Sequence, residues 1–507
     1  MKNSNIYQYS RTLGLATLLM ATVPACKDFL DVPPQGQITE DEIRSNPQAA
    51  QDLVTGVYNV MWIGGFGPDV HSFQYVILTN IASDDADKGS TPQDYGDALD
   101  VDNLTLTPNN SNINNVWTGY YQAIARANQA LDKLPLSPAD ETTKRKLEGE
   151  VRFLRGYFYF NLVRLFGGVP KLDRVPLPEE ANSDQFQTRA SEEEIYQLII
   201  SDLQFAVDNL PEKGQTTIGR ATKGAAQGML AKVYLYRQDY QKAFELSGAV
   251  ITAGKYTLHP RYEEIWRETG NNNNESIFEV QAGINAECNA ATQLYTVSQG
   301  PRQGGRGGWR DLGFGFNSPS ESLVNEYEPN DRRRDATIIF INPSPRGTVL
   351  YDGFRVPSKD SVENFRYNYK AYHSRLTERN CGNNDFLPKQ IRVMRYAEVL
   401  LIHAEAALAL GNTGAAQTDI DQIRARVNLA PVPVTREAIW HERRVELAME
   451  HDRFFDLVRQ EKLQPGRAVQ AFAAHGKTFV KGKNEVFPIP QTQRDLSGGK
   501  LTQNPGY

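Results

Sequence analysis

The residue types of a zinc-protease helix occur together in the string HERRVELAMEH, residues 441–451. Such a helix needs two histidines four residues apart, so that both reach one metal ion from the same face. Val445 stands four residues after His441, and the zinc interpretation therefore fails. The charges instead recur at three-residue steps, which predicts ion pairs along an exposed helix, each worth about 0.2–0.5 kcal/mol. The paired residues are Arg443 with Glu446, Glu450 with Arg453, Arg453 with Asp456 and Asp456 with Arg459.

Other strings that suggest chemistry are incomplete. The glycine-rich GGRGGW, residues 304–309, lacks the lysine and hydroxyl residue that end a phosphate-binding loop, and no GxSxG elbow occurs. The string DDADKGS, residues 84–90, begins like a calcium loop, but Gly96 stands where the bidentate glutamate is needed. The 61 acidic residues guarantee chance carboxylate pairs, so such pairs give no specific evidence of glycoside hydrolysis. We therefore predict no catalytic residues, no metal and no cofactor.

Net charge argues against nucleic acid as a partner. The 507-residue chain carries a net charge of −6. Nucleic-acid binding needs a concentrated basic surface. The densest basic cluster, Arg332–Arg334, is flanked by Asp331 and Asp335, which predicts an ordinary solvated, charge-balanced face.

The N-terminus has the features of an export signal. Lys2 and Arg11 precede an apolar run from Leu13 to Val23, which is shorter than the roughly 20 residues that a membrane-spanning helix needs. The string VPAC ending at Cys26 resembles the bacterial lipobox. We therefore predict a signal peptide over residues 1–25 and a lipid anchor on Cys26, followed by a tether to residue 45. Stable anchoring of this kind needs more than one acyl chain. Removal of the signal peptide changes the net charge of the chain to −8.

Two other cysteines, Cys288 and Cys381, follow in the chain. Neither stands in a CxxC motif or at a spacing typical of zinc ligands, so a zinc framework is not predicted. One disulfide or two unpaired buried thiols both remain open, because the spacing in sequence does not give the distance between the two Cα atoms.

Helical periodicity dominates the rest of the chain. Apolar residues recur at three- and four-residue steps over residues 116–134 and 147–165, and Ser191 with Glu194 forms a capping box for a helix that ends near Leu210. Two helix pairs, residues 228–251 and 397–423, carry small residues 12 apart, which are Ala231 with Ala243 and Ala404 with Ala416. Such pairs are typical of tetratricopeptide repeats, which need neighbours to bury their remaining face. The predicted fold class is all-α.

Between the two pairs, residues 270–389 are rich in glycine, proline, asparagine and aromatic residues and show little helical period. This composition predicts an irregular, loop-rich insertion that carries the ligand surface. We therefore expect an N-terminal helical part over residues 46–269 and a C-terminal helical part over residues 390–507 that completes the scaffold.

Eight segments, taken in order, resemble the SusD/RagB family of outer-membrane lipoproteins of the Bacteroidetes. They are CKDFLDVPPQG, YYQAIARANQAL, EVRFLRGYFYFNLVRLFGGVP, SEEEIYQLIISDL, GRATKGAAQGMLAKVYLYRQDYQKA, MRYAEVLLIHAEA, HERRVELAMEHDRFFDLVR and FPIPQTQRDLSGGKLTQNPGY. The resemblance implies a lipid-anchored protein on the extracellular face of the outer membrane. It also implies a partner, a SusC-like TonB-dependent transporter, over whose mouth the protein acts as a lid.

Carried onto this chain, the family's ligand surface would combine an acidic loop with part of the insertion. The loop supplies Asp84, Asp85, Lys88 and Tyr95, and the insertion supplies Tyr295, Arg302, Trp309, Phe314 and Phe316. Flat aromatic rings suit the apolar faces of neutral sugars, while polar groups suit their hydroxyls. Trp309, set among glycines, is the strongest candidate platform, with Trp62 and Phe66 as alternatives. Phe314 and Phe316 are also compatible with packing beneath the loop, and Trp117 is interpreted as core.

Three functions remain open at this point. The first is a non-catalytic surface lipoprotein that binds an oligosaccharide and delivers it to the transporter. The second is a RagB-like lid that binds peptides instead. The third is a structural or adhesion lipoprotein that contacts only other proteins.

Overall fold

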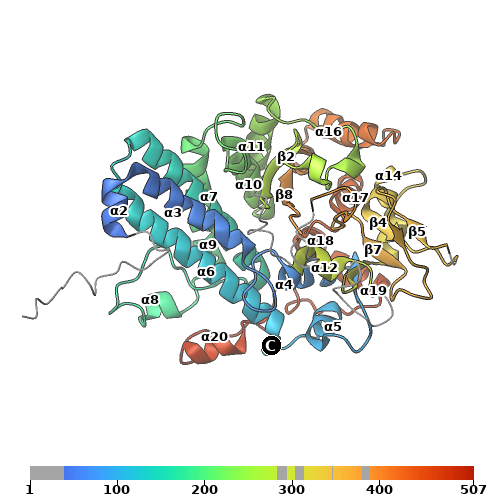
Figure 1. Ribbon diagram of the computed structural model, residues 1–507, viewed down its shortest axis with the longest axis horizontal. Coiled ribbons are helices and arrows are strands. Elements are labelled where there is room, and N and C mark those ends of the chain that lie inside the picture. Colours follow the sequence, from blue (N-terminus) through green and yellow to red (C-terminus); the bar gives the residue numbers. More distant parts are fainter. Residues whose placement is uncertain (1–38, 283–293, 303–312, 345, 380–386) are drawn as a thin grey trace, which may run out of the picture.

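The computed structural model describes residues 39–282, 294–302, 313–344, 346–379 and 387–507 (Figure 1). The predicted signal peptide over residues 1–25 lies outside the described residues, and so do Cys26, Cys288, Trp309 and Cys381. The lipid anchor and the role of Trp309 therefore stay predictions, and the pairing of the two later cysteines stays open.

Long helices with polar caps build the N-terminal part. Pro47 opens α3 behind an Asn46 cap, and Ser191 with Glu194 forms the predicted capping box of α9. Pro135 and Pro211 follow the ends of α6 and α9, and the end of α9 at Asn209 agrees with the predicted end near Leu210. The helices are α2 (Glu40–Ser45), α3 (Pro47–Asn59), α6 (Ser111–Lys133), α7 (Glu141–Phe166) and α9 (Glu192–Asn209).

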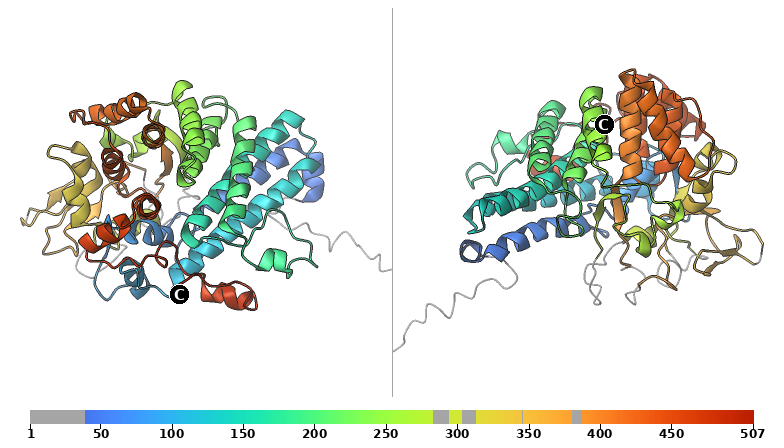
Figure 2. Two further views of the ribbon diagram at one scale, coloured as in Figure 1. Left: turned by 180° about the vertical axis from the view of Figure 1, so that it is seen from behind. Right: turned by 90° about the horizontal axis from the view of Figure 1, so that it is seen from above.

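The two predicted helix pairs are α10 (Lys223–Tyr236) with α11 (Tyr240–Thr252) and α15 (Tyr396–Ala409) with α16 (Thr413–Arg426). All four of the small residues singled out in these pairs are fully buried, which lets the helices approach closely. Because α11 packs on α15, the pairs stack across the insertion that separates them in sequence. The helices α6, α7, α9, α10, α11, α15 and α16 each pack on the next and cross the molecule in chain order (Figure 2). The predicted all-α, tetratricopeptide-like scaffold is confirmed.

The charged segment near residue 443 differs from its prediction. It forms two helices, α17 (Arg436–Leu447) and α18 (Arg453–Leu463), and its charges are buried. Arg443 pairs with Glu398 at 2.8 Å and with Asp456 at 2.7 Å, and not with Glu446. Of the predicted pairs, Asp456 with Arg459 forms at 3.3 Å, but both side chains are buried. The prediction that the helix is exposed was therefore wrong, because helical spacing alone does not show whether a charge meets its own helix or a neighbouring one.

Buried charges extend to the basic cluster in the insertion. Arg333 is completely buried and binds Asp331, Glu442 and Glu446, so only its neighbours Arg332 and Arg334 form the expected solvated face. Arg395 lies between Glu275, Glu446 and Glu450, and its side chain is 1% exposed. Removing one member of such a cluster would leave an uncompensated buried charge, so these contacts tie the insertion to the C-terminal helices.

Short elements complete the chain. Within the part of the chain that the structure describes, four antiparallel strand pairs occur. They are β1 (Ala86–Gly89) with β3 (Phe316–Pro319), β2 (Ser276–Val280) with β8 (Ile391–Arg395), β4 (Ile338–Phe340) with β7 (Arg366–Asn368), and β5 (Thr348–Val349) with β6 (Arg355–Val356). Short α-helices are α4 (Phe73–Val76), α5 (Gly96–Asp102), α8 (Asp184–Gln187), α12 (Leu294–Gln299), α13 (Glu321–Glu326), α14 (Arg332–Thr337), α19 (Arg467–Ala474) and α20 (Gln491–Leu496). A π-helical turn spans Ile77–Ile81, and 3₁₀ turns span Val60–Trp62, Leu134–Leu136, Tyr262–Glu264 and Glu268–Gly270.

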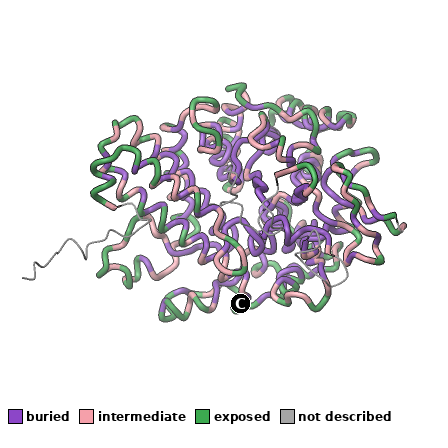
Figure 3. Tube along the Cα trace, viewed as in Figure 1, coloured by how far each residue is buried: buried purple, intermediate pink, exposed green. Residues whose placement is uncertain are grey.

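One hydrophobic cluster runs from Ala50 in α3 to Leu501 near the C-terminus. Trp117 is 4% exposed within it, which confirms its interpretation as core. Buried residues fill the middle of the molecule, and exposed residues gather at the helix ends and outer loops (Figure 3). Within the described residues, no helix is both long enough and apolar enough to span a membrane.

Candidate functional site

Four aromatic side chains form a continuous group, which we call the aromatic surface, made of Phe66, Phe73, Tyr95 and Phe316. The Phe73 ring lies 6.3 Å from Phe66, 5.5 Å from Tyr95 and 4.9 Å from Phe316, measured between ring centroids. Phe73 and Phe316 are buried, Tyr95 is half-buried, and 71% of Phe66 is exposed. The group therefore presents an apolar face to solvent on a buried aromatic base.

The loop that carries Phe66 is held by its own backbone. Val70 N–H donates to Ile63 O at 2.9 Å, and Asp69 N–H donates to Asn115 O of α6 at 3.0 Å. The buried Asp69 carboxylate accepts from the N–H groups of Ser72 and Gln74. Burial raises the pKa of Asp69 to about 7 although these N–H groups favour the ionised form.

The β1–β3 strand pair brings the remaining aromatic residues together. Gly89 at the end of β1 pairs with Phe316 at the start of β3, and Ser90 N–H donates to Gly315 O at 2.7 Å. Gly89 has a φ of 69°, and a Cβ there would lie 2.3 Å from Gly315 O. Only glycine allows this approach, so it fixes where the insertion meets the N-terminal loop.

Polar side chains border the aromatic surface, and we call Lys88, Ser90, Asp94 and Arg302 the polar rim. Arg302 forms an ion pair with Asp94 and donates to Ser90 Oγ at 2.6 Å. Lys88 Nζ donates to the carbonyl oxygens of Thr91 and Asp94 and lies 5.6 Å from the Phe316 ring centroid. Burial lowers the pKa of Lys88. The rim joins the N-terminal loop to the insertion and offers donors and acceptors beside the aromatic rings.

The two acidic residues of the predicted loop lie inside the protein. Asp84 is 1% exposed and accepts from Arg453 at 2.7 and 2.8 Å, while Asp85 accepts from Arg444 at 2.8 Å. Burial alone would raise the pKa of Asp84, but the guanidiniums of Arg453 and Arg444 outweigh it and hold that pKa well below its usual range. Both carboxylates therefore connect the loop to α17 and α18 and face away from solvent. Among the described residues, no cluster of three or more His, Cys, Asp or Glu side chains could hold a metal ion.

The other predicted residues lie at different depths. Tyr295 on α12 is buried, with its hydroxyl 3.2 Å from His451 Nε2. Phe314 and Trp62 are half-buried and pack against the main core. Ring contacts link Phe66 and Tyr95 through Phe73, and Phe316 contacts both Tyr95 and Lys88. Arg302 joins the same group through Ser90 and Asp94. The elements α4, α5 and α12 lie near one another in this part of the molecule (Figure 1).

Sequence reasoning missed Phe73 and Asp94, which connect the predicted residues to one another. Phe73 contacts three aromatic rings of the aromatic surface, and Asp94 holds Arg302. Phe73 gave a weak signal as an aromatic residue just before the apolar run YVIL, which is typical of core. Asp94 gave none, because its partner is 208 positions away in the sequence.

Comparison with known families accounts for most of the chain. Residues 274–507 match the family model described as "SusD family", and residues 28–235 match one described as "Starch-binding associating with outer membrane". A solved structure titled "Laminarin binding SusD-like protein" is 30% identical, covers 91% of this chain and 99% of its own, and superposes with a TM-score of 0.74. The chain belongs to the SusD family.

Curated relatives in the SusD family extend over similar lengths. A SusD-like protein of Bacteroides ovatus is 26% identical over 99% of this chain and 92% of the relative. The starch-binding protein SusD of Bacteroides thetaiotaomicron is 24% identical over 82% of each chain. A SusD superfamily structure from Parabacteroides distasonis, 26% identical with a TM-score of 0.73, covers 91% of this chain and 99% of its own. The aromatic surface thus belongs to a SusD chain that has solved counterparts over about nine-tenths of its length.

Proposed function

We propose that this protein is a lipid-anchored, glycan-binding subunit on the outer face of the outer membrane, and that it delivers a neutral oligosaccharide to a partner TonB-dependent transporter. The observation that carries the proposal is the aromatic surface with its polar rim, in a chain that is 30% identical to a laminarin-binding relative. Starch binding by a second relative favours the same class of ligand. Laminarin and starch are therefore the first two polysaccharides to test.

The chemistry of the surface suits binding without turnover. The exposed Phe66 ring and the half-buried Tyr95 ring offer apolar faces, and the part-exposed Arg302 guanidinium and Asp94 carboxylate of the rim offer a donor and an acceptor for sugar hydroxyls. Asp84 and Asp85 are already neutralised by arginines, so they are poorly placed to act as a proton donor and a nucleophile. We expect the purified protein to bind glycan and to leave it intact.

A binding experiment tests the ligand class. The form that lacks residues 1–26 would be run in native gels that contain laminarin, starch or no polysaccharide, and its retardation would be measured. We expect retardation by a neutral glucan and about tenfold weaker binding by Phe66→Ala, because that change removes an entire exposed aromatic ring. The matched control is Leu177→Ala. It shortens an exposed apolar side chain that is not part of the aromatic surface or the polar rim.

Two results would contradict this part of the proposal. In the first, no neutral polysaccharide retards the wild-type protein but charged oligopeptides bind to it, which would favour a peptide-binding lid. The other is release of reducing sugar by the protein alone, which would make it an enzyme.

The anchor needs a separate experiment. Replacing Cys26 by serine removes the only thiol in the lipobox-like string, so we expect Cys26→Ser to leave the membrane fraction and the wild-type protein to stay there. Fractionation of cells followed by immunoblotting measures both. A Cys288→Ser variant is the matched control and should stay with the membranes. Equal membrane retention of the Cys26 variant would refute lipid anchoring.

A further inference from the structure

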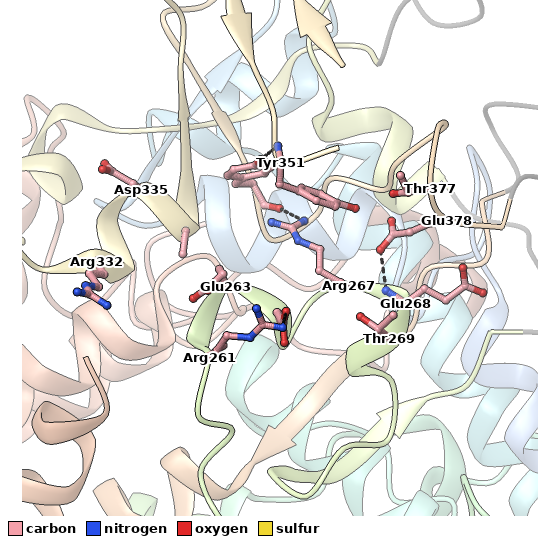
Figure 4. Close-up of a pocket in the computed structure, with 13 residues that line it drawn as sticks. Arg261, Glu263, Arg267, Glu268, Thr269, Arg332, Asp335, Tyr351, Thr377 and Glu378 are labelled. Atoms are coloured by element: carbon pink, nitrogen blue, oxygen red, sulfur yellow. Dashed lines mark hydrogen bonds and ion pairs between the residues drawn. The ribbon is translucent and has the colours of Figure 1, made fainter. Parts of the chain in front are cut away.

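A cavity lies where the insertion meets the segment just before it, away from the aromatic surface. This cavity of about 810 Å³ is lined by residues that include Arg261, Glu263, Arg267, Arg332, Tyr351 and Glu378 (Figure 4). None of its lining residues belongs to the aromatic surface or the polar rim. We call it the tyrosine cavity. Its size is within the usual range of sites for small ligands.

A rigid aromatic platform forms one wall of the tyrosine cavity. The Tyr351 side chain is 47% exposed, and its backbone N–H donates to Tyr369 Oη at 2.8 Å. The Arg267 guanidinium lies 4.2 Å from the Tyr351 ring centroid and 4.5 Å from that of Tyr369. Tyr372 meets the Tyr351 ring edge-on at 6.0 Å. These contacts hold Tyr351 in place while about half of its surface stays open, so a ligand that stacks on it would not have to order the ring first.

Reciprocal hydrogen bonds fix a second wall. Glu268 N–H donates to the Glu378 carboxylate, and Arg379 N–H donates to the Glu268 carboxylate, each at 2.6 Å. The Glu378 carboxylate also accepts from Ser374 N–H at 2.7 Å. Two segments more than 100 positions apart are thus joined at the edge of the cavity. Figure 4 shows Glu378 and Thr377 on one side of Arg267 and Arg332 on the other.

The charges on the walls select against strongly ionic ligands. Three arginines and five acidic residues line the cavity, so a polyanion meets carboxylates and a polycation meets guanidiniums. Glu263 and Arg332 have no side-chain partner among the described residues, which leaves one acceptor and one donor group for a ligand. A ligand with many hydroxyls can donate to the first and accept from the second without carrying charge. A neutral carbohydrate has this chemistry.

We propose that the tyrosine cavity is a second binding site for neutral oligosaccharide, in which the open face of Tyr351 stacks on a sugar ring while Glu263 and Arg332 bind its hydroxyls. The inference rests on the proposed glycan binding and adds a site that is separate from the aromatic surface. Two sites on one protein would strengthen its hold on a long polysaccharide, because binding at one site raises the effective concentration of glycan at the other.

The test uses native gels that contain laminarin and four forms of the protein without residues 1–26, namely wild type, Tyr351→Ala, Phe66→Ala and the double variant. We expect each single change to weaken retardation and the double variant to bind laminarin more weakly than either single variant. Adding Tyr351→Ala to Phe66→Ala should weaken binding about tenfold further. Tyr351→Phe keeps the ring and should bind like wild type. Near-ultraviolet circular dichroism would check that each variant is folded.

The outcomes separate this inference from the proposed function. In one outcome, the wild type binds glycan and Tyr351→Ala has no effect on binding, either alone or together with Phe66→Ala. That result would overturn the second site and leave the first in place. Failure of every neutral polysaccharide to bind the wild type would overturn both. A Tyr351→Ala variant that loses binding to charged oligopeptides, while laminarin binding is kept, would also overturn the carbohydrate assignment of the cavity.

Discussion

At the scale of single residues, His451 shows how a side chain that suggests metal chemistry serves the fold. It joins α17 to α18 with a φ of 75°, and its Nδ1 lies 2.8 Å from Thr79 Oγ1. Burial lowers the pKa of His451 to about 4, although the carboxylates of Asp452 and Glu450 act in the opposite direction. The imidazole is therefore neutral in the folded protein at a pH where the unfolded chain binds a proton.

This difference predicts a pH dependence of stability. Between pH 6.5 and 4 the unfolded state binds more protons at this position than the folded state, so the histidine's contribution is fully present above pH 6.5 and is lost as the pH falls to 4. We expect His451→Asn to reduce the fall in the free energy of unfolding over that range by about 3 kcal/mol. Asparagine also tolerates a positive φ. Urea unfolding of both proteins at pH 7, 5.5 and 4.5 measures the difference, and parallel pH profiles would contradict it.

The candidate site was predictable in its residue types more than in its geometry. Aromatic residues flanked by glycines indicated Phe66 and the insertion, because such segments have little core of their own. The acids of DDADKGS gave a misleading signal, since Asp84 is neutralised by Arg453, which is 369 positions away. Contacts at that separation leave no local pattern in the sequence.

At the scale of elements, local sequence patterns predicted where helices form. They did not predict whether a charged helix face is buried or exposed to solvent. The capping box at Ser191 stands where the sequence predicted it, and α9 ends at Asn209, next to the predicted Leu210. The helices α17 and α18 have ordinary amphipathic spacing, yet Arg443 and Glu446 are fully buried. Periodicity indicates which residues share a face, and the partner of that face decides whether charges on it are solvated.

A close contact of α6 gives a prediction at this scale. A Cβ on Gly119 would lie 2.3 Å from Asp69 O, in the loop that carries Phe66. We expect Gly119→Ala to displace that loop, to lower the free energy of unfolding by about 1–3 kcal/mol and to weaken laminarin binding. Thermal unfolding and native gels measure the two effects.

The matched control is Gly56→Ala in α3, where a Cβ meets no atom within 4 Å. Alanine favours the helix there, so this variant should be as stable as wild type or more stable by up to about 1 kcal/mol. Equal behaviour of the two alanine variants would show that the contact between α6 and the loop does not position the aromatic surface.

At the scale of the whole molecule, extensive packing joins the two parts of the chain that the two family models match. They cover residues 28–235 and 274–507, yet α10 and α11 pack together and α11 packs on α15. Lys232 of α10 binds Glu398 at 2.9 Å and Asp452 at 2.7 Å, and all three side chains are largely buried. The hydrophobic cluster that contains Ala50 also contains Leu501.

We therefore expect neither half to fold alone. A fragment of residues 39–269, expressed without the rest, should expose the α11 face that packs on α15 and the unpaired ammonium of Lys232. It should lack a cooperative thermal transition, and co-expression with residues 270–507 should restore one. Circular dichroism and size-exclusion chromatography measure both. A cooperative transition for the isolated fragment would show that the boundary near residue 269 separates independent domains.

The pairing of β1 with β3 has a consequence for protein engineering. Residues 86–89 and 316–319 come from distant parts of the chain. Because they pair in one antiparallel register, each strand fixes the position of the other. A chimaera could receive only one of these strands from a relative with a different glycan preference. Its β1 and β3 would then come from different proteins, and their side chains and pairing register would not match. Swapping both stretches at once, on an unchanged helical framework, is the route by which selectivity could be transferred between members.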